Sequence, residues 1–68
     1  MLLQEWQILE KIPSLPKLAE RLGVADTTNP ARLVHNWIKG RAIPSSKNMN
    51  KIMKATNGKV SPNDFYTQ

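Results

Sequence analysis

Cysteine is absent from this 68-residue chain, and histidine occurs once, at position 35. The first absence excludes disulfides, and His35 alone cannot build a structural zinc site. The acidic residues are few and dispersed, and His35 has no partner at a recognisable catalytic spacing. We therefore expect no enzyme activity, no cofactor and no metal. A core of this size adds only about 3–5 kcal/mol of stability. We therefore expect a partner subunit to provide additional stability, and the alternative is that tight packing of the helices is sufficient.

Long apolar runs are also absent. No stretch approaches the length of a membrane span, and the first six residues have neither the cationic leader nor the apolar run of a secretion signal. These absences lead us to expect a soluble protein that works inside the cell. A chain of 68 residues makes one domain at most, so we expect a single domain over residues 1–68.

Negative charge is missing from one continuous part of the chain. Between Arg32 and Lys59 there is no acidic residue, and this window has a net charge of +7, against +5 for the whole chain. Its basic residues are Arg32, Lys39, Arg41, Lys47, Lys51, Lys54 and Lys59. A small domain with one basic face and little catalytic chemistry is typical of nucleic-acid binders. A basic amphipathic helix can also lie on an anionic membrane surface, but Trp6 and Trp37 fit better as core residues of separate helices.

The apolar residues repeat at helical spacing, and no segment alternates as a strand does. We predict helices over residues 2–11, 15–22, 30–39 and about 46–56, with Pro13 ending the first and a short final helical turn after Ser61. The expected fold class is therefore all-α, a compact domain of five helices. The expected buried positions are Leu2, Trp6, Leu9, Leu15, Leu18, Ala19, Leu22, Met49, Ile52 and Met53.

The segment 30–39 is the most cleanly two-faced part of the chain. Asn29 is a capping residue, Pro30 suits the first position of a helix, and Gly40 marks its end. At about 100° per residue, one side carries the apolar residues Leu33, Val34, Trp37 and Ile38. The other side carries Asn29, Arg32, His35, Asn36 and Lys39. Such a helix can pack by one face and leave the other free to bind.

Two helices joined at Gly23 and Val24, with Ala19 in the first and Val34 and Trp37 in the second, resemble a helix-turn-helix. The stretches LAERLGV (18–24), VHNWIKG (34–40) and ATNGKVSPNDFY (55–66) look like the Cro/repressor-type (XRE-like) family of phage and bacterial regulators. The resemblance covers about residues 14–66, with the motif at about 15–39. It implies a lambda-repressor-like domain that binds two-fold operator DNA as a dimer and represses transcription.

The chain departs from the family pattern at two places. Val34 follows Val24 by ten residues, about five more than is usual, so we expect an extended turn before the recognition helix. Leu15, followed by Pro16, stands where the family often has a polar residue, commonly glutamine, that contacts phosphate. We therefore expect that backbone contact to be missing here.

By position, the resemblance implies that the polar side of residues 30–39 and its flanks face DNA. The implied residues are Thr28, Asn29, Ala31, Arg32, His35, Asn36, Lys39, Arg41 and Lys47. Arg32 can read guanine O6 and N7 with two hydrogen bonds, and Asn36 can read adenine N6 and N7 in the same way. Thr28 and Asn29, at the helix start, can donate to a phosphate or a base edge.

Lys39, Arg41 and Lys47 suit phosphates as charge partners. Several alternatives stay open at this stage. Asn29 can act as a helix cap alone, and His35 can be an ordinary half-exposed side chain. The closing residues Val60, Phe65 and Tyr66 can complete the core of one subunit or build a contact between two.

The leading hypothesis is a sequence-specific DNA-binding repressor. Its expected partner is double-stranded operator DNA, bound by a homodimer in the bacterial cytoplasm, including that of a phage-infected host. A protein antagonist, or a C-terminal domain outside this sequence, is a further candidate partner. The alternative hypothesis is a protein-interaction module, such as an antitoxin or adaptor, which would need an exposed apolar patch near Phe65 and Tyr66.

Overall fold

The computed structural model describes residues 1–66, and in that range the chain forms five α-helices and no strand. The helices are α1 (Leu3–Leu9), α2 (Leu15–Leu22), α3 (Pro30–Ile38), α4 (Ser46–Ala55) and α5 (Pro62–Tyr66). The all-α class and the number of helices expected from the sequence are thereby confirmed. No helix within the described residues is long and apolar enough to cross a lipid bilayer.

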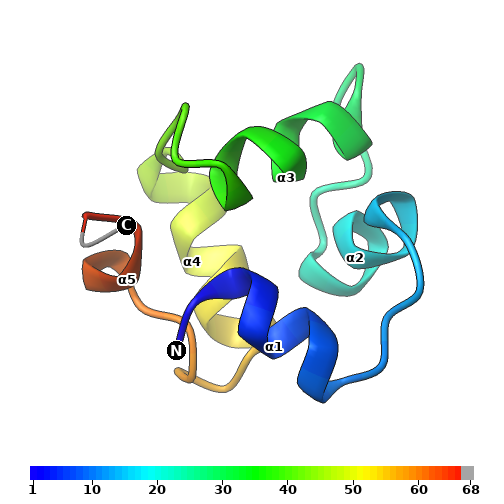
Figure 1. The fold of residues 1–68 in the computed structure, drawn as a ribbon. Coiled ribbons are helices and arrows are strands. Elements are labelled where there is room, and N and C mark those ends of the chain that lie inside the picture. Colours follow the sequence, from blue (N-terminus) through cyan, green and yellow to red (C-terminus); the bar gives the residue numbers. More distant parts are fainter. Residues whose placement is uncertain (67–68) are drawn as a thin grey trace.

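The five helices surround one core (Figure 1). Helix α3 packs mainly against α2 and also contacts α1, while α2 contacts α4. The buried apolar residues are Leu3, Trp6, Ile12, Leu18, Ala19, Leu22, Val24, Val34, Trp37, Met49, Ile52, Val60 and Phe65. Both tryptophans belong to this core, Trp6 from α1 and Trp37 from α3, as their place in the helical pattern predicted.

Helices α2, α3 and α4 each begin at a residue whose side chain caps the helix, and Asn29 at the start of α3 is the cap that the sequence predicted. The side-chain oxygens of Ser14, Asn29 and Ser45 accept the backbone N–H groups of Lys17, Arg32 and Asn48 at 3.4, 3.3 and 3.4 Å respectively. Each of these bonds satisfies an N–H group in the first turn that has no partner inside its helix. The starts of three helices are therefore fixed by interactions with residues only three positions away.

Helix α1 ends earlier than predicted, at Leu9. Lys11 adopts the left-handed conformation with φ of +56°, and the Ile12 N–H donates to the Gln7 carbonyl oxygen at 3.0 Å. This turn closes the helix before Pro13 is reached, so proline is not what ends it. It also brings Ile12 back into the core, where 8% of its surface is exposed.

The buried face of α1 also differs from the prediction. Leu3 and Trp6 are the buried residues of this helix, whereas Leu2 is 38% exposed and Leu9 is 51% exposed. Leu3 and Trp6 are three residues apart and share a face. Leu2 and Leu3 are neighbours of the same type, and only packing against the rest of the core distinguishes them.

Helix α4 buries Met49 and Ile52 as predicted, but Met53 is 37% exposed. The inward face continues instead to Thr56, which is 2% exposed. Its hydroxyl donates to the Ile52 carbonyl oxygen at 2.8 Å and accepts the Val60 N–H at 3.2 Å. Thr56 can be buried because both of these hydrogen bonds satisfy its polar atom.

The closing segment completes the core of a single chain. Val60 is fully buried and Phe65 is 5% exposed, whereas Tyr66 is 68% exposed. Helix α5 begins as predicted, with Ser61 before Pro62. The Asp64 carboxylate accepts the Ser61 N–H at 2.9 Å and the Ser61 hydroxyl at 3.2 Å. Of the three closing residues, only Tyr66 is therefore available to a partner.

The start of α5 carries a testable dependence on pH. The Ser61 backbone N–H that donates to Asp64, assisted by the N-terminal ammonium group at 3.0 Å and by the Ser61 hydroxyl, holds the pKa of Asp64 below its ordinary value. A pKa that is lower in the folded than in the unfolded state adds stability above the unfolded value. That stability is lost as the pH falls through the folded pKa.

We expect Asp64→Asn to lower the free energy of unfolding by about 1 kcal/mol at neutral pH, the usual value of a helix-start interaction. The difference from the unmodified protein should shrink as the pH is lowered below the ordinary carboxylate pKa. Urea unfolding followed by circular dichroism at several pH values measures it. Asp26→Asn is the control, because Asp26 is 76% exposed in a long ion pair and should change little. An Asp64→Asn difference that stayed constant with pH would contradict the assignment.

Candidate nucleic-acid interface

The turn between α2 and α3 is the extended segment that the valine spacing predicted. Gly23 ends α2 with φ of +78°, and the Val24 N–H then donates to the Ala19 carbonyl oxygen at 3.0 Å. Val24 is buried at 1% exposure and anchors the beginning of the turn to the core. Farther along, the Asp26 carboxylate lies 3.8 Å from the Lys51 ammonium group of α4. The turn is thus held at its start by packing and at its middle by a weak ion pair.

Helix α3 is fixed to the protein by its apolar side. Val34 and Trp37 are at most 1% exposed, and Leu33 and Ile38 are partly buried against the same core. At the end of the helix, Gly40 has φ of +75° and the Arg41 N–H donates to the Asn36 carbonyl oxygen at 2.9 Å. This closure sets the backbone of Arg41 relative to α3.

A surface hollow of about 270 Å³ opens at the first turns of α3. Its lining residues come from the extended turn and from the outer side of the helix: Thr27, Thr28, Asn29, Arg32, Leu33 and Asn36. The structure therefore brings four of the proposed DNA-contacting residues, Thr28, Asn29, Arg32 and Asn36, around one feature. A hydroxyl, two amides and a guanidinium group in one place offer hydrogen bonds of both kinds.

The cap at the start of α3 uses only one polar atom of the Asn29 side chain. Its side-chain oxygen accepts the Arg32 N–H at 3.3 Å, and its exposed amide nitrogen makes no hydrogen bond to any described residue. An amide group has two N–H donors on that nitrogen. Asn29 can therefore cap α3 and donate to a ligand at the same time, so its two proposed roles are compatible.

The remaining candidates lie outside the hollow. Ala31 and His35 are half-buried residues of α3. Lys39, Arg41 and Lys47 are exposed and lie at the C-terminal end of α3, in the following loop and in the first turn of α4. Among residues 1–66, none of these three cations forms an ion pair, and neither does Arg32. Their charge is therefore not neutralised by an acidic side chain of the described protein.

The other basic residues of the acid-free window lie elsewhere. Lys51 is half-buried and pairs with Asp26. Lys54 is in the last turn of α4 and Lys59 is in the loop after it, and Figure 1 shows this end of α4 on the opposite side of the molecule from α3. The +7 window of the sequence is thus divided in space. Of the cations without an ion pair, Arg32 and Lys39 lie on α3 and at its end, Arg41 lies in the loop after it, and Lys47 lies in the first turn of α4.

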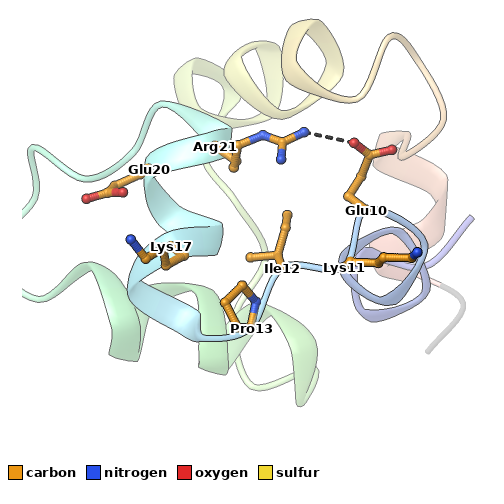
Figure 2. Close-up of a pocket in the computed structure, with 7 residues that line it drawn as sticks. All are labelled: Glu10, Lys11, Ile12, Pro13, Lys17, Glu20 and Arg21. Atoms are coloured by element: carbon orange, nitrogen blue, oxygen red, sulfur yellow. Dashed lines mark hydrogen bonds and ion pairs between the residues drawn. The ribbon is translucent and has the colours of Figure 1, made fainter.

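A second hollow, of about 250 Å³, lies between the end of α1 and α2 (Figure 2). Ile12 and Pro13 form its apolar part, and the charges around it are of both signs. The Arg21 guanidinium donates to the Glu10 carboxylate at 2.8 Å and lies over the Trp6 ring, 5.6 Å from its centroid. A neutralised arginine beside acidic groups does not suit a polyanion, so this hollow is a poorer candidate for nucleic acid than α3.

Two residues of the α3 hollow were not among the predicted contacts. Leu33 was assigned to the buried side of the helix, and the structure places it at the boundary, packed on the core and also lining the hollow. Thr27 belongs to the extended turn, and no spacing rule fixes where residues of an unusual turn will lie. The long distance from Val24 to Val34 was the signal that this turn would add contacts near α3.

Within residues 1–66, no group of three or more histidine, cysteine or acidic side chains is placed to hold a metal ion. No family model, curated protein or solved structure matches the chain. The charge and the side-chain geometry around α3 are therefore the basis for a functional proposal.

Proposed function

We propose that this protein is a sequence-specific double-stranded DNA-binding repressor that places the polar side of α3 in the major groove. One observation carries the proposal. Arg32 on α3, Lys39 at its end, Arg41 in the loop after it and Lys47 in the first turn of α4 have no acidic partner among the described residues. Amide and hydroxyl groups that can read base edges gather beside Arg32. This combination of free positive charge and directional donors suits a duplex.

The proposed roles divide by position on the helix. Arg32 and Asn36 are one turn apart and read base edges, most simply a guanine and an adenine. Thr28 and Asn29 donate to a phosphate at the helix start, where the helix dipole favours negative charge. Ala31 and His35 lie along the same helix and contact the groove wall. Lys39, Arg41 and Lys47 bind phosphates at the other end of α3.

The remaining parts of the proposal concern assembly. A homodimer with a two-fold axis presents two copies of α3 to successive major grooves, which sets half-sites about 34 Å apart or a multiple of that distance. Binding at such an operator represses transcription by excluding other proteins from the same DNA. No membrane and no cofactor take part in this function.

The direct test is selection of bound duplexes from a random-sequence library, followed by footprinting of the selected sequence. We expect one recurring sequence with two-fold related half-sites. Lys59→Ala should select the same sequence with nearly unchanged affinity, since Lys59 follows the C-terminal end of α4, and Figure 1 shows that end of α4 on the opposite side of the molecule from α3. Retention of no sequence above the starting library would overturn the proposal.

The affinity for DNA should fall steeply with salt. Each phosphate neutralised contributes about −0.9 to the slope of log K against log salt concentration, so three phosphate contacts give about −3 per subunit. Fluorescence anisotropy of a labelled duplex at a series of salt concentrations measures the slope. Arg41→Ala should make it shallower by about one, while Lys59→Ala should leave it unchanged. A slope close to zero would rule out the proposed phosphate contacts.

A second candidate, a protein-interaction module, is favoured by a different surface. A hollow of about 260 Å³ between α4 and α5 is lined in part by Pro44, Met49, Met53 and Tyr66. Met53 and Tyr66 are 37% and 68% exposed, so apolar surface is available to a protein partner. The salt series separates the candidates, because an apolar interface responds little to salt.

A further inference from the structure

The hollow at the start of α3 contains one hydrocarbon side chain among polar ones. Its lining is Thr27, Thr28, Asn29, Arg32, Leu33 and Asn36, and of these Leu33 alone has no polar atom. Leu33 is half-buried, with part of its surface packed on the core and part lining the hollow. The methyl groups of the two exposed threonines add to the apolar material on the same lining.

Leu33 has a definite place relative to the proposed base-reading residues. It follows Arg32 directly and precedes Asn36 by three residues, so Leu33 and Asn36 are neighbours on the helix surface. Arg32 and Asn36 are four apart and are neighbours as well. Arg32, Leu33 and Asn36 also line the same hollow. A base edge that met both Arg32 and Asn36 there would therefore lie beside Leu33.

The major-groove edge of DNA carries one apolar group, the C5-methyl group of thymine. We propose that the hollow receives the C5-methyl group of a thymine, with Leu33 as the apolar contact, and that this contact fixes one A·T pair in the operator. The inference rests on the proposed function and adds to it a specificity-determining residue. Beside the methyl group, thymine presents its O4 acceptor, which the hydroxyl of Thr27 on the same lining can bind.

The test removes the methyl group from the DNA and leaves everything else in place. In the selected duplex, each thymine is replaced singly by deoxyuridine, and the affinity is measured for each substituted duplex. Burial of one methylene-sized group corresponds to about a fourfold change in Kd. We expect about this loss at one thymine of each half-site, and little change at thymines outside the contact.

Protein variants test whether Leu33 is the side chain that contacts the thymine methyl group. Leu33→Ala should bring the ratio of the thymine and deoxyuridine affinities at that position close to one. Ile38→Ala is the matched control, because Ile38 is also a partly buried apolar residue of α3 packed on the core, but it does not line the hollow. Ile38→Ala should keep the fourfold ratio. If Leu33→Ala does not fold, as judged by circular dichroism, Leu33→Val, which removes one methylene group, should reduce the ratio.

The outcomes are distinguishable. If no duplex is selected, the proposed function itself fails. If a specific duplex is bound and no thymine responds to loss of its methyl group, the proposed function stands and the thymine contact is wrong. If one thymine responds but the ratio is the same in the Leu33 variants, another side chain holds the methyl group and the assignment to Leu33 is overturned.

Discussion

Replacement of Trp37 by alanine is expected to unfold most of the protein at room temperature. Trp37 is 1% exposed and lies in α3, the helix that packs on α2 and α1. Truncation of a buried aromatic side chain to alanine costs about 3–5 kcal/mol, because burial is lost and a cavity remains. A domain of this length has a total stability of only about 3–5 kcal/mol, so a single truncation of this kind removes most or all of it.

Urea unfolding followed by far-ultraviolet circular dichroism measures the effect. Trp37→Phe is the matched variant, because it keeps an aromatic ring in the same place and should stay folded with a smaller loss. Lys39→Ala changes an exposed residue of the same region and should leave the urea midpoint nearly unchanged. If Trp37→Ala unfolded at the same urea concentration as the unmodified protein, the packing of α3 described above would be wrong.

Replacement of Arg32 by alanine should weaken binding to the selected operator by about 1–3 kcal/mol, or roughly 5- to 150-fold. Arg32 is exposed, lines the hollow with Asn36 and forms no ion pair within the described residues, so its guanidinium is free to bind a guanine edge. Because a bidentate contact discriminates among bases, the loss should be specific. The variant should accept any base pair at one position of each half-site.

The measurement compares the operator with duplexes changed at one base pair and with random DNA. Lys39→Ala should weaken binding to all of them by a similar factor, since a phosphate contact carries no sequence information. Asn36→Ala should relax specificity at a different position from Arg32→Ala. Equal losses on operator and random DNA for Arg32→Ala would show that Arg32 acts as a charge and not as a reader of bases.

The parts of the fold that follow from near neighbours in the sequence were predictable. Ser14, Asn29 and Ser45 start their helices by bonding an N–H three residues ahead, and Gly23 and Asn57 lie at helix ends in the left-handed conformation. These interactions span a few residues and depend little on the rest of the protein. Helix boundaries for α2, α3 and α4 therefore agree closely with the sequence prediction.

Two of the errors, at Leu2 and at Met53, occur where two similar residues compete for one place. Leu2 and Leu3 are adjacent leucines, and Ile52 and Met53 are adjacent apolar residues, so helical periodicity alone does not choose between them. The structure buries Leu3 and Ile52 and leaves their neighbours partly exposed. Which face of α1 and of α4 turns inward depends on the helices packed against it, and this information is spread over the whole chain.

At the candidate site, one feature was predictable from the sequence and another was not. The polar side of α3 was predictable because it is the complement of the side that buries Val34 and Trp37. The hollow was not predictable, because it needs the extended turn to bring Thr27 beside Leu33. The position of such a turn is set by its contacts with the rest of the chain, here chiefly by the burial of Val24, while the long ion pair between exposed Asp26 and Lys51 contributes little.

The amino-acid sequence by itself determined the helical class, the starts of three helices and the amphipathic character of α3, since these follow from interactions within a turn or two of helix. Tertiary structure alone decided which cations accompany α3 and which lie beyond it. A charge window in the sequence records only order along the chain, whereas a binding surface requires proximity in space. The fold divides that window because α4 has Lys47 in its first turn and Lys54 in its last turn, and Figure 1 shows the last turn of α4 on the opposite side of the molecule from α3.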